Sequence, residues 1–150
     1  MKNIYTNQVV AELKERVEKL TPYSQARWGK MSVAQMLAHT NVQYEMLYED
    51  VHKPIPGFVK FMLRSFVKKG VVNETPYKKN SGTAPQMIIK GARDFQREKV
   101  RLVSYLQRVC DEGALDFENR EHMAFGKLST IEWNNLFYKH LDHHLTQFGV

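Results

Sequence analysis

The chain has 150 residues, of which 43% are apolar and 25% charged, and its formal net charge is +6. This length suits one domain over residues 1–150, and eight Phe, seven Tyr and two Trp exclude a disordered chain, because burial of that much apolar surface can offset the ordering entropy. One cysteine, no secretory signal and no run of about 18 uncharged apolar residues lead us to expect a cytoplasmic protein without a membrane-spanning helix.

Two helices are predicted in the first third of the chain. Apolar residues recur at the helical period from Thr6, which can cap the first turn, to about Leu20. The second helix follows Ser32, because Ser32 and Gln35 form the pattern of a capping box. Its apolar positions continue to about Glu49.

Residues 51–82 are punctuated by Pro and Gly around one short predicted helix, Gly57 to Lys69. Between Lys53 and Lys79 there are seven basic residues and one acidic residue, so this stretch accounts for the whole net charge. We call residues 53–79 the basic segment. We expect residues 51–82 to form a lid-like insert.

The third long helix is predicted from about Ala92 to Asp111, with Gly113 as its stop. An alternative start lies earlier, because Thr83 opens another capping-box pattern. That start would place Gly91 inside the helix.

The fourth long helix is predicted to follow Ser129, which forms a capping box with Glu132, and to run to the end of the chain. No alternating strand pattern and no internal repeat are present. We therefore expect an all-α fold, a four-helix bundle with a long crossover between the second and third long helices. Such a crossover permits those two helices to run parallel.

Three histidines are predicted to face the core. His140 and His144 lie one turn apart on the apolar face of the last helix, a spacing that offers two nitrogen ligands to one ion. His39, on the margin of the buried stripe of the second helix, is the candidate third ligand. Three neutral nitrogens suit Zn, Ni, Cu or Fe rather than Mg or Ca, and they leave a position open for water or substrate.

The competing interpretation makes these histidines core residues without an ion. They would then need polar partners, because an unpaired buried polar group costs about 1–3 kcal/mol. Gln147, Asp142 or a backbone carbonyl could supply them. His122 and His143 could instead be surface residues, and His52 is interpreted as a loop residue.

Cys110 is predicted to be a small structural residue rather than a nucleophile. It lies on the inward face near the C-terminal end of its helix, where burial and the helix dipole both raise the pKa of a thiol. Neither a phosphate-binding Gly-rich loop nor a cysteine zinc cluster is present, and no Ser-His-Asp set is found near a tight turn.

Several motifs together resemble the DinB-like superfamily, and within it an uncharacterised branch of unknown function. They are WGKMS with QMLAH (28–39), FGKLS with EW (125–133), YKHLDHHLTQF (138–148), TPYKKN (75–80) and RDF (93–95). The resemblance spans nearly the whole chain. The sequence departs from that branch where Met123 and Ala124, rather than Pro and Phe, follow His122.

The resemblance implies a four-helix bundle with a long crossover, and a divalent metal, Zn or Ni above all, on His39, His140 and His144. Characterised DinB-like proteins include transferases and isomerases that use mycothiol, bacillithiol or glutathione, and stress proteins of unknown substrate. Homodimers are frequent among them. A homodimer and a small-molecule substrate are therefore expected here.

The leading functional hypothesis is a metal-dependent thiol S-transferase or hydrolase. The open position of the ion would bind a thiol or a water and lower its pKa. The basic segment would cover the mouth of the site, with Arg64, Lys68 or Lys78 as partners of an anionic thiol cofactor or acid substrate. The alternative is a non-catalytic, metal- or ligand-binding stress-response bundle.

A third hypothesis gives the basic segment its own role, with Phe58, Met62 and Phe66 docking into an anionic membrane or a partner groove. The preferred interpretation is that these residues cover the bundle while the lysines face solvent. No specific nucleic-acid binding is expected, because the basic residues lack the interleaved aromatics of a single-strand platform.

Overall fold

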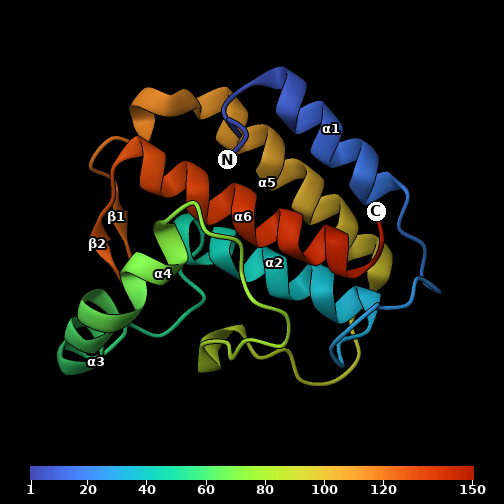
Figure 1. The fold of residues 1–150 in the computed structure, drawn as a ribbon, viewed down its shortest axis with the longest axis horizontal. Coiled ribbons are helices and arrows are strands. Elements are labelled where there is room, and N and C mark those ends of the chain that lie inside the picture. Colours follow the sequence, from blue (N-terminus) through green and yellow to red (C-terminus); the bar gives the residue numbers. More distant parts are fainter.

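The computed structural model describes residues 1–150, and the chain is mostly helical (Figure 1). Four long helices lie side by side: α1 (Asn7–Glu18), α2 (Val33–Tyr48), α5 (Phe95–Asp116) and α6 (Thr130–Gln147). Both α2 and α1 pack against α5 and α6. Helices α2 and α5 run in the same direction, as the long connection between them permits (Figure 1). This arrangement is compatible with the predicted all-α fold.

Two of the helix starts are set by capping boxes, as predicted. The hydroxyl of Ser32 accepts from the backbone N–H of Gln35 at 3.2 Å, and the Gln35 side chain accepts from the backbone N–H of Ser32 at 3.0 Å. Ser129 and Glu132 make the same pair of bonds at 3.3 and 3.0 Å. Each box satisfies two helix N–H groups that would otherwise lack a partner, so α2 and α6 begin at Val33 and Thr130.

The start of α5 differs from both predicted positions. The carboxylate of Asp94 accepts from the backbone N–H of Arg97 at 2.8 Å and caps the helix, which begins at Phe95. The earlier pattern yields only one 3-10 turn, Pro85–Met87. At the other end, Gly113 breaks the helix in the left-handed region (φ 74°), and a short continuation reaches Asp116.

A small hairpin between α5 and α6 was not predicted. Strands β1 (Glu121–His122) and β2 (Gly126–Lys127) pair antiparallel. Two-residue strands are too short to show an alternating pattern in the sequence.

The core is aromatic at its centre and polar in one region. Phe137 on α6 stacks on Tyr44 with ring centroids 5.0 Å apart, and it meets Phe117 edge-on at 5.7 Å. Most of the buried polar side chains lie on α2 and α6, among them His39, Thr40, Asn41, Gln43, Asn135, Lys139, His140, His144 and Gln147. Most of the polar side chains of the interior therefore belong to these two helices.

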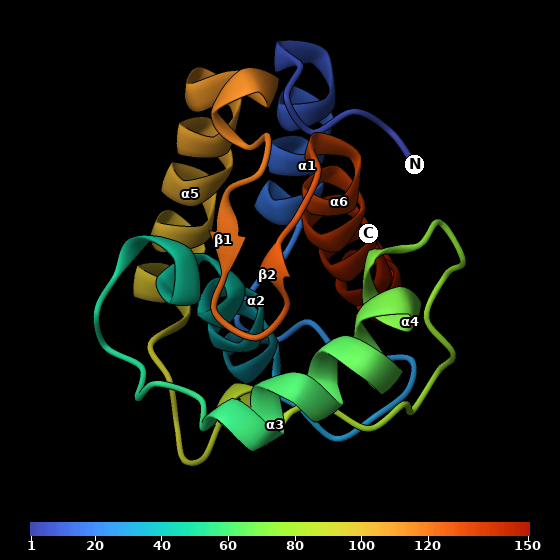
Figure 2. The ribbon, with the colours of Figure 1, turned by 90° about the vertical axis from the view of Figure 1, so that its left-hand side faces the viewer.

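The basic segment forms α3 (Gly57–Met62), one π-helical turn (Leu63–Val67) and α4 (Lys68–Val72), which extends past the predicted end at Lys69. Figure 2 shows this segment lying outside the four long helices. None of the helices combines the length and the apolar character needed to cross a membrane.

Lys139 on α6 binds the C-terminal end of α4. Its ammonium group donates to the carbonyl oxygens of Gly70 at 3.0 Å and Asn73 at 2.6 Å. Burial lowers the pKa of Lys139 to about 8. Asn135 adds a bond from its amide to the carbonyl of Val72 at 3.0 Å.

The preferred interpretation of the apolar residues in the basic segment is wrong. Phe58 is 76% exposed, Phe66 74% and Met62 39%, so these side chains do not cover the helices. The segment is apolar around most of its circumference, and only one stripe of a single short helix can face the molecule. Leu63 and Val71, which are half-buried against the core, occupy that stripe.

Candidate metal centre

His39, His140 and His144 converge at one point between α2 and α6. Their ring centroids form a nearly equilateral triangle with sides of 4.9, 4.7 and 4.8 Å. One nitrogen atom from each ring lies within 4.8 Å of the other two, and all three residues are buried. The three histidines could therefore hold a metal ion.

Hydrogen bonds orient two of the three rings. The Nδ1 atom of His39 lies 2.8 Å from the carbonyl oxygen of Met87, and that of His144 lies 2.8 Å from Oε1 of Gln147. Both oxygens only accept, so each Nδ1 carries the hydrogen and each Nε2 has a free lone pair. A histidine ligand needs such a lone pair, and a second partner on the other nitrogen fixes its orientation.

His140 is the ring whose hydrogen bonding is incomplete. Its Nε2 lies 3.0 Å from Nε2 of His39, so without an ion one hydrogen must be shared between these two atoms. Its Nδ1 is buried and has no partner. Of the partners predicted for the histidines of the last helix, Gln147 is confirmed at His144, the backbone carbonyl is found at His39 instead, and Asp142 pairs with Arg16 at 2.7 Å.

The three imidazoles are held in their neutral form. Burial lowers the pKa of His39, brings that of His144 to about 3 and takes that of His140 well below its usual range. Each ring also makes a positive charge on its neighbours unfavourable. Neutral imidazole is the form that binds transition metals, so protons do not compete with an ion here at neutral pH.

A pocket of about 570 Å³ includes the three histidines in its wall. Of its 29 lining residues, 15 are hydrophobic and none is Asp or Glu, so the pocket suits a largely apolar molecule and offers no carboxylate base. The wall comes from residues 28–31 before α2, from α2 and α6, from the inner stripe of the basic segment, from the loop over residues 77–89 and from the hairpin.

Three further side chains surround the histidine cluster. The ring of His143 lies 5.8 Å from that of Tyr77 and 5.7 Å from that of Trp28, and all three line the pocket. The ammonium group of Lys79 lies 4.5 Å from the Trp28 ring centroid. His143 is half-buried rather than a surface residue, because the rings of Tyr77 and Trp28 pack against it.

His122 is also buried, although the sequence suggested a surface residue. Its Nδ1 accepts from the backbone N–H groups of Ala124 and Phe125 at 3.1 and 3.2 Å, so its hydrogen is on Nε2. The residue is 8% exposed and lines the pocket. The sequence signal that could have found it is the short turn after His122, in which a side-chain acceptor can bond N–H groups two and three residues later.

Lowering the pH from 6.5 to 4 should destabilise the protein, because His122 is buried in its neutral form. Burial lowers the pKa of His122 from 6.5 to about 4, so the unfolded chain binds this proton at higher pH than the folded protein does. The contribution of His122, ~3 kcal/mol, is therefore present above pH 6.5 and is lost as the pH falls through 4. Denaturant midpoints against pH measure this loss. His122→Asn, which keeps an acceptor but does not titrate, should make the profile shallower by about this amount, while the buried histidines of the cluster keep their own share of the pH dependence. An unchanged profile would contradict the role of His122.

The predicted cofactor partners lie apart from the pocket wall. Arg64, Lys68 and Lys78 are not among the lining residues. Lys68 pairs with Glu132 at 2.9 Å, and the guanidinium of Arg64 lies over Gly126, 3.1 Å from where a side-chain Cβ would stand.

Cys110 has the structural character that was predicted for it. Burial raises the pKa of its thiol, with a further increase from Asp111. It packs against the core and does not line the pocket. His52, placed in a loop as predicted, bonds to Glu45 at 2.8 Å.

One family model matches the chain, over residues 6–149, and its description is "Protein of unknown function (DUF1569)". No curated protein and no solved structure matches the chain significantly.

Proposed function

The chain belongs to the DUF1569 family, a family of unknown function, and we propose that it is a metal-dependent enzyme whose ion is bound by His39, His140 and His144. The observation that carries this proposal is the convergence of three buried imidazoles, two of which are oriented by hydrogen bonds on Nδ1. A cluster of core histidines without an ion would not need three rings to meet at one point.

The chemistry of the donors supports a transition metal. All three ligands are neutral nitrogens and no carboxylate lines the pocket, which suits Zn²⁺ or Ni²⁺ and not Mg²⁺ or Ca²⁺. The 3.0 Å approach of the Nε2 atoms of His39 and His140 points the same way, because an ion would use both lone pairs, whereas without it these two atoms must share one hydrogen.

The reaction class follows from what the pocket contains. When bound, the ion would lower the pKa of a coordinated thiol or water toward neutrality. The apolar wall would exclude bulk water and hold the apolar part of the substrate, and Nε2–H of His122 offers a hydrogen bond to an acceptor atom. A thiol S-transferase or a hydrolase fits these groups best. Arg64, Lys68 and Lys78 lie outside the pocket wall, so we propose them only as partners of an anionic group that extends beyond it.

The resemblance to DinB-like proteins supports further proposals about the fold, the oligomeric state and the location of the protein. The packing of α1, α2, α5 and α6 around a long crossover supports a DinB-like four-helix bundle. A homodimer and a cytoplasmic location remain proposals on that resemblance.

A non-catalytic metal-binding protein is the second candidate. The absence of Asp and Glu from the pocket wall favours it, since no carboxylate could act as a general base. Turnover with a low-molecular-weight thiol and an electrophile by the metal-loaded protein, lost in His39→Ala, would decide for the enzyme.

Elemental analysis of untagged, freshly purified protein tests the metal centre directly. We expect one equivalent of Zn or Ni per chain, and Co²⁺ substitution should give the visible absorption of a site with nitrogen ligands. Protein that contains no transition ion, and whose Co²⁺ spectrum is that of the free ion, would overturn the proposal.

Replacing Gln147 by methionine should weaken Zn²⁺ binding by about 10–100-fold, because His144 then loses the acceptor that orients it. Competition with a chromophoric chelator measures this affinity. Gln43→Met is the matched control, since Gln43 also lines the pocket but bonds to none of the three histidines. Equal affinities of the two variants would show that Gln147 does not support the site.

A further inference from the structure

We propose that the outward side of the basic segment docks onto an anionic membrane surface. The proposal concerns Phe58, Phe61 and Phe66, which we call the phenylalanine face, together with the basic residues beside them. It is independent of the metal centre.

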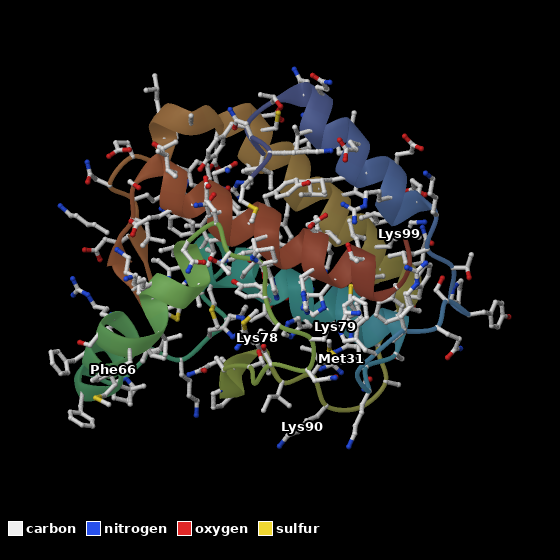
Figure 3. All side chains as sticks on the ribbon, viewed as in Figure 1. Met31, Phe66, Lys78, Lys79, Lys90 and Lys99 are labelled. Atoms are coloured by element: carbon white, nitrogen blue, oxygen red, sulfur yellow. The ribbon has the colours of Figure 1, made fainter.

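The phenylalanine face is exposed to a degree that packing does not explain. Phe58 is 76% exposed, Phe61 61% and Phe66 74%. Figure 3 shows Phe66 on the part of the molecule that projects from the long helices. Clustered exposed aromatics on one surface are typical of interaction sites rather than of scattered surface variation.

The fold leaves this side free while it uses the opposite side. Leu63, Val67 and Val71 from the same segment line the pocket, and Lys139 holds the end of α4 against α6. The segment is therefore anchored along its inner stripe, and its outer aromatics have no internal partner. Side chains on such an anchored helix could enter the interfacial region of a bilayer without unfolding anything.

The charge around the phenylalanine face selects the kind of partner. Lys53, Lys60 and Lys69 are exposed, and the structure gives none of them an acidic partner, whereas the guanidinium of Arg64 is turned onto Gly126. The single acidic residue of the segment, Glu74, lies 3.8 Å from the N-terminal ammonium group. This surface is thus positive without compensation, and an anionic layer would be attracted to it.

An anionic bilayer fits both properties at once. A second copy of the chain, docked face to face, would bring two positive surfaces together, and a soluble polyanion would leave the aromatics unused. A bilayer with acidic headgroups offers negative charge at the surface and an apolar layer just beneath it, the combination that basic amphipathic helices recognise.

Vesicle co-sedimentation of the full chain tests the proposal. We expect binding to phosphatidylcholine vesicles that contain phosphatidylglycerol and little binding to phosphatidylcholine alone. The triple variant Phe58→Ser, Phe61→Ser, Phe66→Ser should bind at least about tenfold more weakly, because the apolar contact is lost. Its circular dichroism and melting temperature should not change, since these side chains are exposed.

Matched variants separate the contribution of apolar insertion to vesicle binding from the contribution of charge. Tyr23, Leu115 and Ile131 are 84%, 90% and 67% exposed elsewhere on the surface, and their triple serine variant should bind as the wild type does. Lys60→Glu with Lys69→Glu should weaken binding, whereas Lys19→Glu with Arg97→Glu should do so much less. No binding to the acidic vesicles, or binding that the phenylalanine variant leaves intact and that DNA reproduces, would overturn the proposal.

Discussion

Replacing His144 by alanine is expected to lower the affinity of the protein for Zn²⁺ by more than about 100-fold. Loss of an outer partner alone costs about 10–100-fold at such sites, and His144→Ala removes a ligand itself. Helix α6 then offers one nitrogen instead of two, and His39 across the interface cannot make up the difference. Isothermal titration, or competition with a chelator, measures the change. His39→Ala should have a similar effect.

Two other histidines serve as controls for that experiment. His52 bonds to Glu45 outside the cluster, and His143 lines the same pocket without belonging to the triangle of rings. His52→Ala and His143→Ala should both keep one equivalent of Zn²⁺ with an affinity near that of the wild type. An isotherm that His39→Ala and His144→Ala leave unchanged would rule out this centre.

Replacing His140 by leucine is expected to change stability in opposite directions with and without metal. In the metal-free protein the variant should melt about 2–4 °C higher, because a buried imidazole whose Nδ1 lacks a partner is replaced by an apolar side chain. In saturating Zn²⁺ the wild type should gain about 4 kcal/mol at 1,000 times the dissociation constant, roughly 8–16 °C for a chain of this length. The variant should gain little, and should then be the less stable protein.

Thermal unfolding in EDTA and in excess Zn²⁺ measures the difference in melting temperature between the variant and the wild type under both conditions. The core-histidine interpretation expects a different result: the wild-type melting temperature would not respond to either condition, and the leucine variant would be more stable in both. The reversal of sign is therefore the discriminating observation. His140→Gln, which retains polarity but not the ligand, should fail to respond to Zn²⁺ and show no increase in EDTA.

Local sequence determined where the helices begin. Capping boxes such as Ser32 with Gln35 involve only neighbouring residues, so the pattern is readable without the fold. The start of α5 was missed because two patterns competed. The carboxylate of Asp94 caps the helix, whereas Thr83 lies in a stretch that forms only one 3-10 turn before the left-handed Gly91.

The candidate ligand set was predictable in part. Helical spacing places His140 and His144 on one face, His39 was the candidate third ligand from its place on the margin of the buried stripe, and the resemblance implied the same three residues. The hydrogen-bond partner of His39 is the carbonyl of Met87, which lies 48 residues away in the chain. Asp142 was a predicted partner of the histidines, but its side chain bonds to Arg16 on α1. Such pairs form only when the helices are packed.

The sequence by itself therefore determined which stretches form the four long helices, though not the start of α5, together with the position of the excess charge and the three candidate histidines, because each depends on periodicity, caps or composition over a few residues. Only the tertiary structure decided that His122 is buried and that Phe58 and Phe66 are exposed. A segment that is apolar around most of its circumference does not indicate which side will be covered. The covered side is decided by contacts with neighbouring elements. Here the inner stripe of the segment packs against the pocket, and Lys139 of α6 bonds to the end of α4.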